Sequence, residues 1–157
     1  MPRFSQPFAR SLALPLACSL IVLLAACGEV EDTRPGQPVK TRQQAFKDII
    51  KVFEPMGVML REKRYEPEKF LRLASALHER RDAPWAHFGP DTNYPPTKAT
   101  AKLWEDTARF TQEKEKFLAA TDGLLAAAKS QDEAKIQAAY EAVHASCQDC
   151  HKPFKTR

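Results

Sequence analysis

The sequence predicts an all-α protein folded as an antiparallel four-helix bundle. After Val39, apolar residues recur almost throughout at steps of three and four, which is the period of an amphipathic helix. No run shows the strict alternation, or the β-branched and aromatic enrichment, that is typical of a strand. The connections between the four helical segments are mostly short or medium, so consecutive helices are expected to run antiparallel.

The first two helices are expected from about 39 to 63 and from 67 to about 81. Pro55 and Gly57 lie inside the first helix and predict a kink, whereas Pro67 suits the first turn of the second. The apolar faces comprise Phe46, Ile49, Ile50, Phe53, Met56 and Leu60 in the first helix, and Phe70, Leu73, Ala74 and Leu77 in the second.

Prolines and glycines concentrated between 82 and 96 predict a long loop. A third helix is expected from Thr97 to Lys129, with Lys114 interrupting its apolar stripe, and Asp132 is expected to cap a fourth. Within an arc of about 120°, the stripe of this last helix continues into the cysteines. Its members are Ile136, Ala139, Tyr140, Val143, Cys147, Cys150, His151 and Phe154.

Residues 1–26 are expected to be a lipoprotein signal peptide. The first ten residues carry two arginines and no acid, and the uncharged run at 11–26 is rich in leucine and alanine. At about 16 residues this run is shorter than the roughly 20 needed for a membrane-spanning helix. It ends in Leu24-Ala25-Ala26-Cys27, which resembles a bacterial lipobox and predicts a diacylglycerol on the Cys27 thiol. The alternative is ordinary cleavage after Gly28, which would release a soluble protein.

Residues 27–38 are expected to be the lipidated N-terminus and a tether, because Gly28 to Pro38 holds prolines and acids without an apolar period. Residues 39–157 would then form the bundle. We expect the chain to face the periplasm while anchored to a membrane, and Gly28 after the cysteine favours the outer membrane. The formal net charge of +4 in 157 residues is small and evenly spread, which does not indicate a nucleic-acid ligand.

Cys147-Gln148-Asp149-Cys150-His151 is a Cys-x-x-Cys-His motif, the attachment signature of c-type haem. On a helix, both sulfurs and the imidazole face the same side. Two thioethers would hold one haem c, and His151 would coordinate the iron as proximal ligand. The alternatives are a redox dithiol, which usually sits in a βαβ unit, and a zinc site, which needs further ligands at metal spacing.

With this motif near the end of the last helix, the sequence resembles the cytochrome c′ family, the class II c-type cytochromes. The resemblance implies a four-helix bundle with haem c covalently attached near the C-terminus. One departure is Lys155, where the family commonly has an arginine, preceded by Pro153, which should bend or end the helix. The stretches that carry the resemblance are Val39-Lys40-Thr41-Arg42-Gln43-Gln44-Ala45-Phe46, Pro84-Trp85-Ala86-His87-Phe88-Gly89-Pro90 and Ala145-Ser146-Cys147-Gln148-Asp149-Cys150-His151.

The resemblance also implies roles for the first helix. Arg42 and Gln43 match the pair that contacts the haem propionates, and Phe46 matches the position over the distal face of the iron. Phenylalanine has no lone pair, so this match implies five-coordinate, high-spin iron that binds NO or CO in an apolar pocket. Helical spacing alone favours Phe46 as a core aromatic, and Trp85 and Phe88 suit either covering a haem edge or anchoring the loop.

The expected function is therefore gas binding rather than catalysis, since no distal acid–base pair is apparent. The alternative is a six-coordinate, low-spin electron-transfer cytochrome with Met56, Met59 or a loop histidine as sixth ligand. Expected partners are NO or CO and the membrane through Cys27, while the basic C-terminus suits either docking to a redox partner protein or simple solvation. Relatives are often homodimers through the first two helices, so the resemblance also admits a homodimer.

Overall fold

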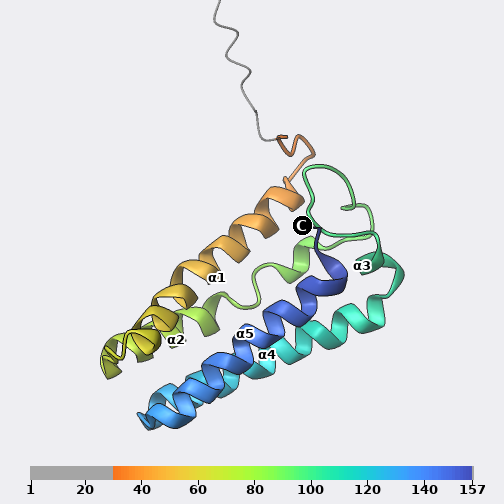
Figure 1. The fold of residues 1–157 in the computed structure, drawn as a ribbon. Coiled ribbons are helices and arrows are strands. Elements are labelled where there is room, and N and C mark those ends of the chain that lie inside the picture. The colour runs from red at the N-terminus through yellow and green to blue at the C-terminus, as the bar shows by residue number, and fades with distance from the viewer. Residues whose placement is uncertain (1–29, 157) are drawn as a thin grey trace, which may run out of the picture.

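The computed structural model describes residues 30–156, which form four long helices joined by two turns and one long connection. The connection between α2 and α4 contains a 3-10 turn, η1 (Trp85–His87), and one short helix, α3 (Lys102–Glu105). The predicted all-α four-helix bundle is confirmed, with successive long helices running in alternating directions (Figure 1). These helices are α1 (Pro38–Arg61), α2 (Pro67–Arg80), α4 (Thr107–Ser130) and α5 (Glu133–Phe154).

Apolar side chains from all four long helices form the core. Phe70 and Leu77 of α2 are fully buried, because the residues spaced three and four apart on this short helix share one face. Met56 and Met59 of α1 are core residues too, which is the packing role that flexible methionine side chains commonly take. Further fully buried members are Leu124, Ala128, Ile136 and Val143.

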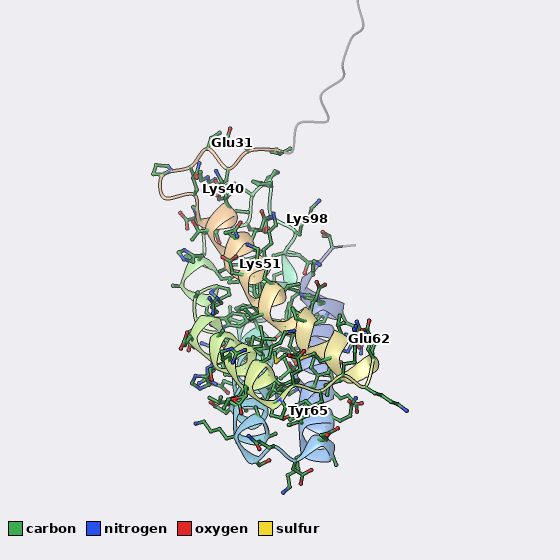
Figure 2. All side chains as sticks on the ribbon, turned by 90° about the vertical axis from the view of Figure 1, so that its left-hand side faces the viewer. Glu31, Lys40, Lys51, Glu62, Tyr65 and Lys98 are labelled. Atoms are coloured by element: carbon green, nitrogen blue, oxygen red, sulfur yellow. The ribbon has the colours of Figure 1, made fainter. Side chains whose placement is uncertain are left out.

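The helices pack in the order α1 on α2, α2 on α4 and α4 on α5, whereas α1 and α5 touch only sparsely. One contact between α1 and α5 is the stack of Phe53 on Tyr140, whose ring centroids are 4.4 Å apart. The start of α1 and the end of α5 lie at the same end of the bundle, where the long connection also passes (Figure 1). Figure 2 shows Lys40 and Lys98 toward this end, and Glu62 and Tyr65 toward the other.

The third predicted helix is wrong at its start and is not continuous, since residues 97–101 are not in a helix and the chain breaks at Asp106. Instead of one helix from Thr97, the chain forms α3 and then breaks at Asp106, whose backbone leaves the helical region. The Asp106 side chain accepts a hydrogen bond from Arg109 N at 3.2 Å, so this residue caps α4. The predicted cap at Asp132 is confirmed, since its carboxylate accepts from Lys135 N at 3.1 Å.

In the predicted tether at 27–38, of which the structure describes residues 30–38, one residue is held by the folded domain. Asp32 is only 1% exposed, and its carboxylate accepts hydrogen bonds from Val39 N at 2.9 Å, Lys40 N at 3.1 Å and Tyr94 Oη at 2.8 Å. The first amides of a helix have no partner within the helix, so a carboxylate that meets them is strongly held. The chain therefore joins the folded domain at Asp32.

The predictions for the signal peptide and for Cys27 lie outside the described residues. Among residues 30–156, none of the helices combines the length and the apolar character needed to cross a bilayer.

Candidate haem site

The Cys-x-x-Cys-His motif lies in the last two turns of α5. Cys147 and Cys150 are free, half-buried thiols, and Cys147 packs against the hydrophobic core. Burial raises the pKa of Cys147. Burial, the charge of Glu113 and the neighbouring Cys147 together raise the pKa of Cys150 to about 11. This setting disfavours the thiolates that zinc and redox dithiols require, and it suits the uncharged thioethers of haem c.

His151 follows Cys150 directly and carries the imidazole of the motif. His151 is an exposed residue, but its ring is partly shielded from water, and this desolvation and the positive charge of Lys155 lower its pKa. A lowered pKa favours the neutral imidazole, which is the form that binds a metal. His151 therefore has the protonation state that an axial iron ligand needs.

A segment of the long connection pins the end of α5 that bears the motif. Thr100 N donates to Phe154 O at 3.0 Å, and Thr100 Oγ1 donates to Pro153 O at 2.9 Å. A single antiparallel bridge pairs Ala99 with Lys155. Pro153 was expected to bend or end the helix, and α5 does end one residue later, at Phe154. These contacts fix the motif relative to the long connection.

Phe46 lies on α1 within a cluster of aromatic side chains from other elements. Its ring centroid is 5.5 Å from that of Trp85 and 6.3 Å from that of Phe88. Phe110 of α4 extends the cluster, with centroid distances of 5.1 Å to Phe88 and 5.7 Å to Phe154 at the end of α5. Edge-on aromatic contacts of this kind make an apolar wall between α1 and α5. Trp85 and Phe88 thus anchor their loop and also surround Phe46.

Arg42 is 3% exposed and holds the long connection against α1. Its guanidinium donates to His87 O, to Thr92 Oγ1 and O, and to Thr97 Oγ1, at distances between 2.6 and 3.0 Å. These bonds use the four terminal N–H groups, so only the Nε–H remains of the five donors. Burial lowers the pKa of Arg42, against the opposing effects of Tyr94 and Asp32.

Gln43 takes part in the same arrangement, because its amide nitrogen donates to Pro96 O at 3.0 Å. Arg42 and Gln43 therefore both fasten the loop that lies beside Phe46. Their contact with haem propionates stays a prediction.

The sequence did not reveal Glu113, whose residue is 5% exposed on α4. The helical spacing could have predicted that Glu113 is buried, because it lies three residues after Phe110 and four before Phe117, on the apolar stripe. The prediction placed the interruption of the stripe at Lys114 instead, but Lys114 is only half-buried.

The residues present fit haem c. Two thiols and an imidazole lie on the end of α5, aromatic side chains extend from there to α1, and α1 and α5 touch only sparsely. The Nε1–H of Trp85 is buried and has no hydrogen-bond partner among residues 30–156, so a donor in this wall is available to a bound group.

Comparison with known proteins gives the same assignment. A family model described as Cytochrome C′ matches residues 37–155. Cytochrome c′ from Rubrivivax gelatinosus is 34% identical over 129 residues, which covers 79% of this chain and 98% of the relative. Cytochrome c′ from Alcaligenes xylosoxydans xylosoxydans is 30% identical over 125 residues, which covers 79% and 97%.

Solved structures agree at the level of the fold. Cytochrome c′ from Rubrivivax gelatinosus matches with a TM-score of 0.75 and 31% identity, covering 80% of this chain and 100% of that one. Cytochrome c prime from Shewanella frigidimarina matches with a TM-score of 0.76 and 30% identity, covering 80% and 98%. A nitric oxide complex of a leucine-to-alanine variant of the Alcaligenes xylosoxidans protein matches with a TM-score of 0.74 and 30% identity, covering 81% and 99%.

The family match across nearly the whole bundle agrees with the motif on α5. This chain belongs to the cytochrome c′ family.

Proposed function

We propose that this chain binds nitric oxide and carbon monoxide at a five-coordinate, high-spin haem iron, and that it is a binding protein rather than an enzyme. The observation that carries the proposal is Phe46. Its ring lies among Trp85 and Phe88 and has no lone pair to offer the iron. A nitric oxide complex of an Alcaligenes xylosoxidans relative supports the choice of ligand.

Members of this family bind haem c covalently, and this chain carries the two cysteines for it. Cys147 and Cys150 would hold the haem through thioethers, and His151 would ligate the iron on the proximal side. When bound, the haem supplies an iron that can accept a diatomic ligand. Arg42 and Gln43, one turn before Phe46, are the proposed contacts of the haem propionates.

The side chains around Phe46 would determine which ligands enter. An apolar aromatic wall gives no hydrogen bond from Phe46 to a bound ligand and crowds the distal side. Water is disfavoured in such a pocket because it loses its hydrogen-bond partners on entry. Dioxygen bound to iron draws negative charge and is stabilised by a hydrogen-bond donor, which the Phe46 ring does not supply, whereas nitric oxide and carbon monoxide depend less on such a donor.

A low-spin electron-transfer cytochrome is the alternative, and the packing of α1 argues against its methionine ligands. Met56 is fully buried and Met59 is 5% exposed, both within the core. They lie ten and thirteen residues beyond Phe46, about 15 to 20 Å along the helix. Using either as sixth ligand would require core residues to leave their packing.

The absorption spectrum of the purified holoprotein tests the proposal. We expect high-spin spectra in both oxidation states and a new spectrum on adding nitric oxide to the ferrous form. Phe46→Met should convert the iron to a low-spin, thioether-ligated form and weaken nitric oxide binding, whereas Phe53→Met, two turns further along α1, should leave the spectrum unchanged. A split low-spin α/β pattern in the unmodified protein would contradict the proposal.

We further propose that the chain faces the periplasm and is held at a membrane through a diacylglycerol on Cys27. The sorting pattern at Gly28 favours the outer membrane. The sequence Leu24-Ala25-Ala26-Cys27 supports this location. A homodimer through α1 and α2 and a redox partner protein are the proposed protein contacts. The exposed Ile50 and Val58 on α1 support the homodimer.

A further inference from the structure

Glu113 is a buried acidic side chain on α4 that the gas-binding site does not use. Its side chain is 6% exposed, and its Oε1 pairs with Lys116 Nζ at 3.0 Å. The Lys116 side chain is 52% exposed, so solvent screens the cation more than the carboxylate. The second oxygen, Oε2, is buried and has no hydrogen-bond partner among residues 30–156.

The packing of α4 on α5 brings Glu113 to the level of the haem-attachment motif. The two helices run antiparallel, and the ring of Phe110 on α4 lies 5.7 Å from that of Phe154 on α5 (Figure 1). Glu113 is one turn after Phe110, and Cys150 is one turn before Phe154. Glu113 therefore lies at the level of α5 where Cys150 would hold the haem.

We propose that Glu113 is a fixed, buried anion beside the Cys150 attachment that lowers the reduction potential of the haem. Reduction adds one electron to the iron, converting Fe(III) to Fe(II), so the net charge of the haem falls by one. A nearby negative charge in a poorly solvated setting disfavours that change. The half-exposed Lys116 offsets only part of the effect. The inference requires the attached haem and does not depend on the ligand bound by the iron.

The test is the reduction potential of holoprotein Glu113→Gln, measured by spectroelectrochemical titration with redox mediators as the electron source. Glutamine keeps the shape of the side chain and removes its charge. We expect the equilibrium constant for reduction to rise about tenfold, a positive shift of about 59 mV for one electron. The shift should persist at about 1 M salt, where exposed charges are screened beyond about 3 Å.

Glu115→Gln is the matched control, because Glu115 is an exposed glutamate on the same helix. It should change the potential little, and any change should vanish at high salt. An unchanged potential in Glu113→Gln, or an equal shift in Glu115→Gln, would overturn the proposal.

Lys116→Gln provides a second test that does not disturb the buried site. Removing the exposed cation leaves Glu113 without its counter-charge, so the potential should fall. A rise or no change would contradict the role of Glu113. Failure of the gas-binding proposal would instead appear as a low-spin spectrum in the unmodified protein, so the two results are separable.

Discussion

At the scale of single residues, Arg42 joins α1 to the loop over the site through four hydrogen bonds. Lysine keeps the charge but cannot reproduce the planar fork of donors. Arg42→Lys should therefore leave buried loop acceptors unpaired and lower the free energy of unfolding by about 2 to 4 kcal/mol. Urea unfolding of the holoprotein measures the loss. Arg72→Lys on the exposed face of α2 is the control and should change stability by less than about 0.5 kcal/mol.

Residue identities at the site were predictable to different degrees. Cys147, Cys150 and His151 follow from a local motif, which needs no knowledge of the fold. The roles predicted for Phe46, Arg42 and Gln43 come only from matching the first helix to the family position by position. Helical spacing alone makes Phe46 an ordinary core aromatic. The loop contacts of Arg42 join residues about fifty positions apart, and no local pattern encodes such pairs.

At the scale of elements, the α1–α5 contact depends on a helical glycine. A methyl group at Gly57 would meet the hydroxyl of Tyr140, so only glycine lets the tyrosine ring stack on Phe53. Gly57→Ala should lower the free energy of unfolding by about 1 to 3 kcal/mol, although alanine is the better helix former. Tyr140→Phe, which removes the nearest atom, should restore part of the loss in the double variant.

Gly123→Ala is the control for that prediction, because a methyl group at Gly123 on α4 has no atom within 4 Å. It should stabilise the protein by about 0.5 to 1 kcal/mol. The measurement is thermal unfolding of the unmodified protein, the Gly57→Ala variant, its double variant with Tyr140→Phe, and the Gly123→Ala variant. A stabilised Gly57→Ala variant would show that Tyr140 moves aside at little cost.

The start of α1 should depend on pH through Asp32. Burial acts to raise the pKa of Asp32, but hydrogen bonds from Lys40, Tyr94, Arg34 and Val39 outweigh it and hold the pKa below its ordinary value. The stabilisation is therefore complete above the unfolded pKa of about 3.9 and is lost as the pH falls through the lower folded pKa.

Asp32→Asn should consequently show a smaller fall in melting temperature than the unmodified protein between about pH 5 and pH 2. The reason is that the variant has no carboxylate to protonate at this position. Glu31→Gln changes the adjacent exposed acid and should retain the full fall. Equal acid sensitivity of Asp32→Asn and the unmodified protein would show that the pairing of Asp32 does not contribute.

Helices with strong apolar periodicity were predicted almost to their ends, and elements set by side-chain hydrogen bonds were not. α2 begins at Pro67 and ends one residue before its predicted end, because its apolar face and its proline both mark the helix. The break before α4 depends on one capping carboxylate, Asp106, inside a segment whose apolar period continues. The burial of Asp32 depends on Tyr94, which is distant in sequence.

At the scale of the whole molecule, the proposed lipid is tested by Cys27→Ala. The variant should lose the mass of the diacylglycerol adduct and should move from the membrane fraction to the soluble fraction, because one thiol carries the anchor. Mass spectrometry and fractionation after lysis measure both effects. Retention of the Cys27→Ala variant in the membrane fraction would refute the anchor.

The burial of Asp32 shortens the distance over which such an anchor could act. Asp32 is the fifth residue after Cys27, and five residue steps reach at most about 18 Å when fully extended. Asp32 lies just before the start of α1, which is at the same end of the bundle as the end of α5 (Figure 1). A lipid on Cys27 would thus keep the haem-bearing end close to the hydrocarbon layer. Apolar gases dissolve better in hydrocarbon than in water, so the bilayer would act as a reservoir that delivers ligand directly to the protein.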